Sequence, residues 1–184
     1  MIIKSVKVGN LETNCYILSD ETSREAVVID PGGEAAKIMP LIEDLQVRYI
    51  ILTHGHPDHF GALDLLKQKT GAKILMNPGD DWFIKPEQDL NEGDEVKFGQ
   101  TILRVIATPG HSRGGICLYG EGRLFSGDTL FYDNSGRTDL IGSSEEEMRQ
   151  SLHRLGQLPS DTLVYPGHGR FTTIGQEKDF GTLG

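Results

Sequence analysis

The chain has 184 residues, 37% of them hydrophobic and 24% charged, and this composition predicts a single ordinary globular domain over residues 1–184. Its formal net charge of −9 argues against a nucleic-acid partner, which would need a basic surface, but not against a small anionic substrate beside a metal site. No apolar run approaches the about 20 residues that cross a bilayer, so no membrane partner is expected.

The N-terminal segment and the cysteines bear on the cellular compartment. Residues 1–8 alternate like a strand and lack the charged-then-apolar layout of a signal peptide, which predicts a cytoplasmic protein. Cys15 and Cys117 lie far apart in apolar segments, which indicates buried thiols in a reduced compartment. Neither a disulfide framework nor a catalytic cysteine is therefore expected.

The first half of the chain opens with strands and then mixes helices with strands. Residues 30–33, Asp-Pro-Gly-Gly, form a clear turn signal, and Gly71 is a suitable C-cap for a preceding helix. The expected strands are residues 2–8, 14–18, 26–29, 47–52 and 72–76, and the expected helices are residues 34–45 and 59–69.

The second half begins after a polar stretch, residues 77–91, in which Trp82, Phe83 and Ile84 form a candidate short cover. Strict βαβ alternation is missing from both halves, which favours two sheets covered by helices, an α+β fold, over one doubly wound sheet. Strands are expected at 95–98, 101–107, 115–119, 123–126 and 162–165, a hairpin turn at 121–122, and a helix from Ser143 or Ser144 to Leu155.

The most informative stretch is residues 53–59, Thr-His-Gly-His-Pro-Asp-His, which follows the expected buried strand 47–52. It holds three of the six histidines and one aspartate: His54, His56, Asp58 and His59. Imidazoles and a carboxylate clustered at the end of a strand are the ligands that a borderline-soft divalent metal prefers.

Three further candidates follow the same rule of placement. His111, Asp128 and His168 each come just after an expected strand, and each has a glycine directly before it, which permits a close backbone approach. Each alone is more often a turn residue, and Asp58 alone could cap the helix that follows it. His153, on an amphipathic helix, is interpreted as structural. Taken together, the seven residues predict a metal site.

Seven ligands are too many for one tetrahedral ion, which takes about four, but they suit two ions with a shared carboxylate. His54 and His56 face the same side of an extended segment and would hold one ion with His111. Asp58, His59 and His168 would hold the second, with Asp128 as the bridge. Two ions about 3.5–4 Å apart clamp a hydroxide and stabilise developing charge on a substrate oxygen. Zinc is the favoured ion, and iron or manganese would suit the same ligands.

The order of these ligands resembles that of the metallo-β-lactamase superfamily, and the match covers nearly the whole chain. The resemblance implies a four-layer αββα sandwich with a dinuclear site at one edge of the inner sheets, and it assigns the seven ligands in the same way. Within the superfamily the chain is most similar to small glyoxalase II-like proteins, the hydroxyacylglutathione hydrolases. The supporting segments are residues 124–131, 136–140, 165–169 and 172–177.

One departure concerns the substrate. Full-length glyoxalase II enzymes carry a C-terminal helical region that supplies much of the glutathione site, and this chain ends about ten residues beyond Gly175. A smaller or different thioester is therefore an alternative to S-lactoylglutathione. Tyr132 and Arg137, shortly after Asp128, are candidate contacts for an anionic substrate tail, and the alternative for both is a structural or salt-bridge role.

The resemblance leads to the hypothesis that the protein hydrolyses a small-molecule thioester, with a metal-bound hydroxide as nucleophile and Asp58 orienting it or accepting its proton. The alternative is a persulfide dioxygenase with a single iron held by His54, His111 and Asp128. A β-lactamase does not fit the expected cytoplasmic location, a nuclease would need a basic surface and an added domain, and a non-catalytic module would not need open metal positions. The sequence does not indicate an oligomeric state.

Overall fold

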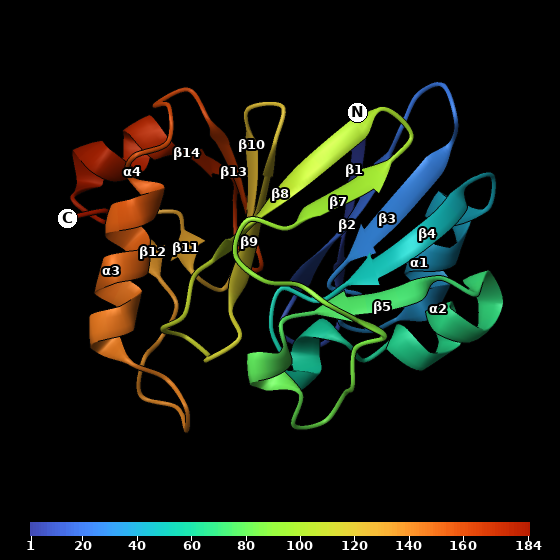
Figure 1. Ribbon diagram of the computed structural model, residues 1–184, viewed down its shortest axis with the longest axis horizontal. Coiled ribbons are helices and arrows are strands. Elements are labelled where there is room, and N and C mark those ends of the chain that lie inside the picture. The colour runs from blue at the N-terminus through green and yellow to red at the C-terminus, as the bar shows by residue number, and fades with distance from the viewer.

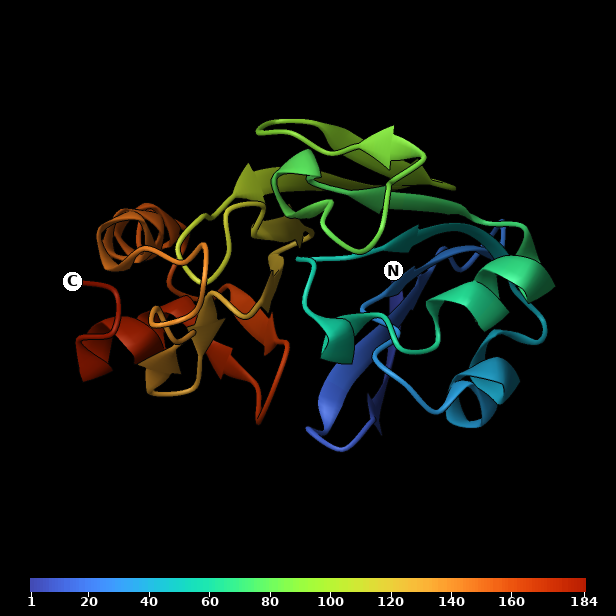
Figure 2. The ribbon, with the colours of Figure 1, turned by 90° about the horizontal axis from the view of Figure 1, so that it is seen from below.

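The computed structural model describes all residues from 1 to 184 and has the expected α+β architecture. Two six-stranded sheets lie against each other, with helices α1 and α2 on one outer side and α3 and α4 on the other (Figure 1). The view turned by 90° shows the same two pairs of helices at opposite ends of the molecule (Figure 2). None of the helices has both the length and the apolar character that a bilayer crossing requires.

The first sheet has the order β1-β2-β3-β4-β5-β6. Its first three strands are antiparallel, and the pairs from β3 to β6 are parallel. The parallel pairs need crossovers: α1 connects β3 to β4, α2 connects β4 to β5, and residues 77–87 connect β5 to β6. The elements are β1 (Ile2–Val8), β2 (Thr13–Ser19), β3 (Glu25–Ile29), α1 (Ala35–Ile42), β4 (Gln46–Ile51), α2 (Leu63–Thr70), β5 (Lys73–Met76) and β6 (Gln88–Asp89).

The second sheet has the order β14-β13-β10-β9-β8-β7 and is antiparallel except for β10 and β13, which α3 connects. A small hairpin, β11 with β12, lies beside it. The elements are β7 (Glu95–Phe98), β8 (Thr101–Ala107), β9 (Ile116–Gly120), β10 (Arg123–Gly127), β11 (Leu130–Phe131), β12 (Asn134–Ser135), α3 (Glu145–Leu155), β13 (Leu163–Pro166), β14 (Thr172–Thr173) and α4 (Ile174–Phe180).

Three apolar clusters fill the spaces between the four layers. The central one lies between the sheets and includes Tyr16, Phe98 and Phe125, all fully buried. The other two lie under α1 and α2 and under α3 and α4. Because β2 faces an apolar layer on each side, all seven of its residues are buried. Cys15 and Cys117 are buried free thiols, as the sequence predicted.

The expected helix over residues 59–69 was wrong at its start. Residues Pro57–His59 form a 3-10 turn, and α2 begins only at Leu63. The segment between them is held against the turn at residues 30–33: the Ala62 N–H donates to the Pro31 carbonyl, and a Cβ on Gly61 would lie 2.5 Å from the Gly32 carbonyl oxygen. These tertiary contacts override the helical pattern.

The other differences are smaller. Helix α1 ends at Ile42, three residues before the predicted end. Trp82 and Phe83 are 50% and 70% exposed, and their role as a cover stays a prediction. Strand β14 and helix α4 were not predicted, because two and seven residues are too few for a clear hydrophobic period. The turn at Glu121 and Gly122, both with positive φ, is as expected.

Candidate metal centre

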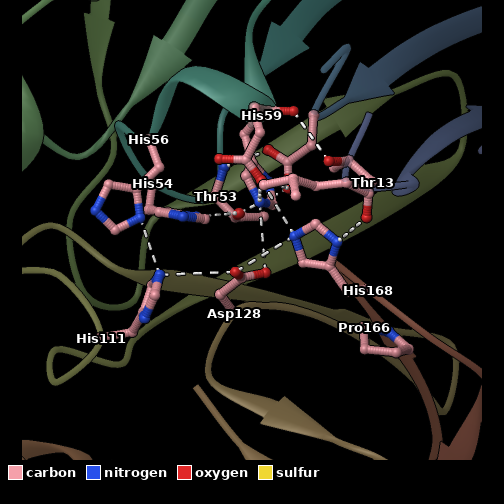
Figure 3. A network of polar contacts seen from close by, with 12 residues as sticks. Thr13, Thr53, His54, His56, His59, His111, Asp128, Pro166 and His168 are labelled. Carbon is pink, nitrogen blue, oxygen red and sulfur yellow. Dashed lines mark hydrogen bonds and ion pairs between the residues drawn. The ribbon is translucent and has the colours of Figure 1, made fainter. Parts of the chain in front are cut away.

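All seven predicted ligands meet at one edge of the sandwich (Figure 3). They come from the loops that follow β4, β8, β10 and β13, so the first sheet supplies four of them and the second sheet three. Within each of three groups, the candidate ligand atoms lie within 4.8 Å of one another. The groups are His54, His56 and His111; Asp58, His59 and His168; and His54, His59 and Asp128.

The first triad consists of His54, His56 and His111. Nδ1 of His56 lies 2.9 Å from Nε2 of His111. The far nitrogens of two rings are fixed by neighbours: Nδ1 of His54 lies 3.1 Å from the Thr53 hydroxyl, and Nδ1 of His111 lies 2.9 Å from the Arg137 carbonyl oxygen. These contacts direct the Nε2 atoms of both rings towards the centre, which is how proteins orient metal-binding histidines.

The second triad consists of Asp58, His59 and His168. Oδ2 of Asp58 lies 3.2 Å from Nε2 of His168 and 3.5 Å from Nε2 of His59. Nδ1 of His168 lies 3.0 Å from the Leu11 carbonyl oxygen, in the turn between β1 and β2. The backbone at Asp58 is held by the Thr13 hydroxyl, which donates to its carbonyl oxygen at 3.0 Å.

Asp128 lies between the two triads and faces both. Its Oδ1 is 3.4 Å from Nε2 of His59, and its Oδ2 is 3.6 Å from Nε2 of both His111 and His168. A Cβ on Gly167 would lie 2.2 Å from Oδ1 of Asp128, so only glycine permits this approach. This is the position that a carboxylate shared between two ions must take.

Several buried polar atoms at the centre have no hydrogen-bond partner, namely Nε2 of His54, Nε2 of His59 and Oδ1 of Asp128. Buried polar groups are almost always paired, so a cluster of orphaned atoms indicates a missing binding partner. Imidazole nitrogens and a carboxylate oxygen are ligands for zinc, iron or manganese. The residues present therefore fit bound divalent cations.

The pKa values of the candidate ligands are shifted in both directions by burial and by neighbouring charges. Burial lowers the pKa of His54 well below its usual value, and the neighbouring histidines add to this, so the ring stays neutral. The carboxyl of Asp58 has a pKa of about 2: burial raises it, but the hydrogen bond to His168 and the charge of His59 outweigh burial. The pKa of Asp128 is also lowered, because His59 and its neighbours outweigh burial. Burial alone would lower the pKa of His59, yet the carboxylates of Asp128 and Asp30 raise it.

Asp30 is a functional residue that the sequence reasoning missed. It is buried at the end of β3 with a φ of 50°, and its carboxylate accepts from the Thr53 N–H at 2.8 Å and the Thr53 hydroxyl at 2.7 Å. Its Oδ2 also lies 3.0 Å from Nδ1 of His59, close enough for an ion pair although not aligned as a hydrogen bond. Its place directly after an expected strand is the signal that could have identified it.

The two predicted substrate contacts lie outside the ligand cluster. The exposed guanidinium of Arg137 pairs with Asp139 at 2.7 Å, while its carbonyl oxygen faces His111. The ring of Tyr132 lies 3.3 Å below the guanidinium of Arg170 and packs edge-on against Phe180. Their substrate roles stay predictions. His153 is exposed on α3 and belongs to neither triad.

Comparisons with known proteins find relatives over nearly the whole chain. A family model described as the metallo-beta-lactamase superfamily matches residues 8–168. The hydroxyacylglutathione hydrolase GloC of Haemophilus influenzae is 34% identical, with 97% of this chain and 95% of GloC covered. The crystal structure of ETHE1 from Myxococcus xanthus is 33% identical with a TM-score of 0.90, covering 97% and 82% of the two chains. A di-iron-bound structure of TTHA1623 is 34% identical with a TM-score of 0.85, covering 95% and 96%.

Proposed function

The chain belongs to the metallo-β-lactamase superfamily of metal-dependent hydrolases, and from that premise we propose that it cleaves a thioester such as S-lactoylglutathione or a similar hydroxyacyl-thiol. The observation that carries the proposal is the complete second triad, Asp58 with His59 and His168, joined to the first by Asp128. A hydrolase that activates water between two ions needs both triads and the shared carboxylate.

The two triads and Asp128 would have separate roles in holding the ions. His54, His56 and His111 would hold one divalent ion, Asp58, His59 and His168 the other, and Asp128 would contact both. Such ions, when bound, lower the pKa of water to about 7 and polarise the carbonyl that water attacks. The buried rings and carboxylates hold this geometry in advance, because Thr53, Arg137 and Leu11 fix the outward nitrogens of His54, His111 and His168.

Asp58 is the proposed catalytic carboxylate as well as a ligand. It is only half-buried, and its pKa of about 2 keeps it ionised at neutral pH. An ionised carboxylate at this position can orient the attacking water or accept its proton.

GloC supports the choice of substrate class. It is named a hydroxyacylglutathione hydrolase, and this chain covers 95% of its length. A relative of this size therefore carries that name without a large additional region. A glutathione thioester therefore stays among the proposed substrates.

The test is metal content combined with a thioester assay on purified protein. We expect about two ions per chain and hydrolysis of S-lactoylglutathione, with loss of at least about 100-fold in kcat/KM for His168→Ala, because the second triad is then incomplete. His153→Ala is the matched control, since His153 is exposed on α3 and should leave the rate unchanged. The proposal fails if fully metal-loaded protein cleaves no acyl-thioester above background.

A second candidate is the persulfide dioxygenase with a single iron. The observation in its favour is that His54, His111 and Asp128, the ligands it would use, line one small void of about 10 Å³ beside Thr53. One iron per chain, oxygen uptake on a persulfide and no thioester hydrolysis would favour it over the hydrolase.

A further inference from the structure

We propose that Asp80 is a positioning residue that locks the two histidine loops of the first triad to each other and thereby sets the metal affinity of that triad. The inference deepens the proposed function, because it rests on the same two-ion site. Asp80 ends the 3-10 turn Pro78–Asp80 after β5 and belongs to no motif of the chain. It is only 4% exposed.

The carboxylate of Asp80 joins loops that follow strands of different sheets. Its Oδ2 accepts a hydrogen bond from the Gly55 N–H at 3.1 Å, and its Oδ1 accepts one from the Gly114 N–H at 2.8 Å. Gly55 stands between His54 and His56, whereas Gly114 follows His111 by three residues. One side chain therefore connects the backbone between His54 and His56 to the loop that carries His111. Hydrogen bonds to an ionised acceptor are among the stronger ones in proteins.

The backbone of Asp80 packs so closely against Gly55 and Gly114 that neither position has room for a side chain. A Cβ on Gly55 would lie 2.5 Å from the Asp80 carbonyl oxygen, and a Cβ on Gly114 would lie 2.7 Å from the Asp80 nitrogen. Both loops thus carry glycine where the turn touches them. The turn itself is fixed by Asn77, whose side chain accepts from Gly79 at 2.9 Å and donates to the Leu90 carbonyl at 2.7 Å.

The charge of Asp80 lies on the side of the metal centre that the first triad occupies. No lysine or arginine pairs with this buried carboxylate; its acceptors are met by the two backbone N–H groups alone. Asp80 stands beside His56. The two residues line a small void together with Gly55, Trp82 and Ser112. Asp58, His59 and His168 make no hydrogen bond or ion pair with Asp80. The effect of Asp80 should therefore be confined to the first triad.

The test measures metal binding to each triad separately. The metal-free protein is titrated with Co²⁺, and the visible absorption is followed in two backgrounds: His168→Ala, which leaves the first triad intact, and His56→Ala, which leaves the second. Asp80→Asn places an amide donor against one of the two backbone donors and removes the charge. We expect it to weaken Co²⁺ binding about 10- to 100-fold in the His168→Ala background, as for other residues that orient metal ligands, and to leave the His56→Ala background unchanged.

Asp81→Asn is the matched control, because Asp81 is exposed, is adjacent to Asp80 and forms no side-chain hydrogen bond or ion pair with either loop. Should Asp80→Asn not fold, Gly114→Ala takes its place: it keeps the carboxylate but forces it away from the His111 loop, and the same selective loss is expected. Equal loss in both backgrounds, or no loss in either, overturns the inference. The Co²⁺ titration needs no substrate, so absence of thioester hydrolysis would overturn the proposed function and leave the role of Asp80 intact.

Discussion

Asp30 shows how one buried carboxylate can support ligands on both sides of the metal centre. It holds Thr53, which contacts His54, and it faces the outward nitrogen of His59. Its positive φ is a conformation that aspartate adopts more readily than most residues, and the Asp-Pro-Gly-Gly turn depends on it. The residue therefore combines a backbone role in the turn with a side-chain role at the site.

Asp30→Ala should reduce the free energy of unfolding of the metal-free protein by about 3 kcal/mol, because the buried Thr53 N–H loses its acceptor and His59 loses a carboxylate. Asp30→Asn keeps one acceptor and should cost about half as much. Urea unfolding followed by circular dichroism measures both. Asp44→Ala, at an exposed aspartate, is the control and should stay within about 0.5 kcal/mol of wild type. Equal stability of the Asp30 and Asp44 variants would contradict this role.

Residue type and strand-end position were enough to name the seven residues that the structure gathers at the centre. His54, His111 and Asp128 are chemically distinctive and follow strands long enough to be recognised. Asp80 could not be identified in this way, because it lies in a polar stretch that also contains Asp81 and Asp89, and no sequence pattern distinguishes the three. Its role depends on two backbone contacts from segments far away in the sequence. Tertiary proximity of this kind has no local pattern.

Helix α3 illustrates how an element outside the site supports it. The Ser144 N–H donates to the Gly110 carbonyl at 2.7 Å, and the Ser151 hydroxyl donates to the Pro109 carbonyl at 2.7 Å. A Cβ on Gly110 would lie 2.4 Å from Cα of Met148, so the segment before His111 lies directly on the helix. The start of α3 therefore helps to place His111.

Ser144→Ala should lower the free energy of unfolding by about 1 kcal/mol. The Ser144 hydroxyl is the N-cap of α3 and accepts a hydrogen bond from the Glu147 N–H at 3.3 Å, which alanine cannot replace. Thermal or urea unfolding gives the value. Ser144→Asp restores a capping oxygen and is the control; if it loses as much stability as the alanine variant, the cap is not the cause.

The elements that the sequence predicted well are those whose pattern repeats several times. Strand β8 and helix α3 each offer enough residues for a clear period. The start of α2 was misplaced because residues 60–62 follow contacts with the turn at 30–33 rather than their own propensity. Short elements such as β14 are defined by their partners and have no period of their own.

At the scale of the whole molecule, Asp20 joins the two sheets at the edge of β2. Its carboxylate accepts from Thr22 and Ser23 in its own turn and from the Gln100 N–H, in the turn between β7 and β8, at 3.0 Å. These hydrogen bonds lower the pKa of Asp20 from 3.8 to about 2, and the largest contributions come from Ser23 and Gln100. Gly99, beside Gln100, allows the approach, since its Cβ would lie 2.3 Å from Cγ of Asp20.

The lowered pKa predicts how stability depends on pH. A carboxyl group with a folded pKa below its unfolded pKa contributes stability that is fully present above pH 3.8 and lost as pH falls through about 2. Asp20→Asn should therefore have a lower melting temperature than wild type at pH 7, and the gap should close between pH 4 and pH 2. Melting curves over this range test it. Asp161→Asn, at an exposed aspartate, is the control, and its melting temperature should not converge on that of wild type in this way. If the difference in melting temperature between Asp20→Asn and wild type stays constant down to pH 2, the role given to Asp20 is refuted.

The division of the ligands between the two sheets has a consequence for biosynthesis. A nascent chain gains its ligands in order, and before residue 128 has been made it offers only one complete triad, that of His54, His56 and His111. The paired site closes only when Asp128 and His168 have been added and β13 has docked beside β10. Only molecules that have been translated past β13 and have folded can therefore form the paired site.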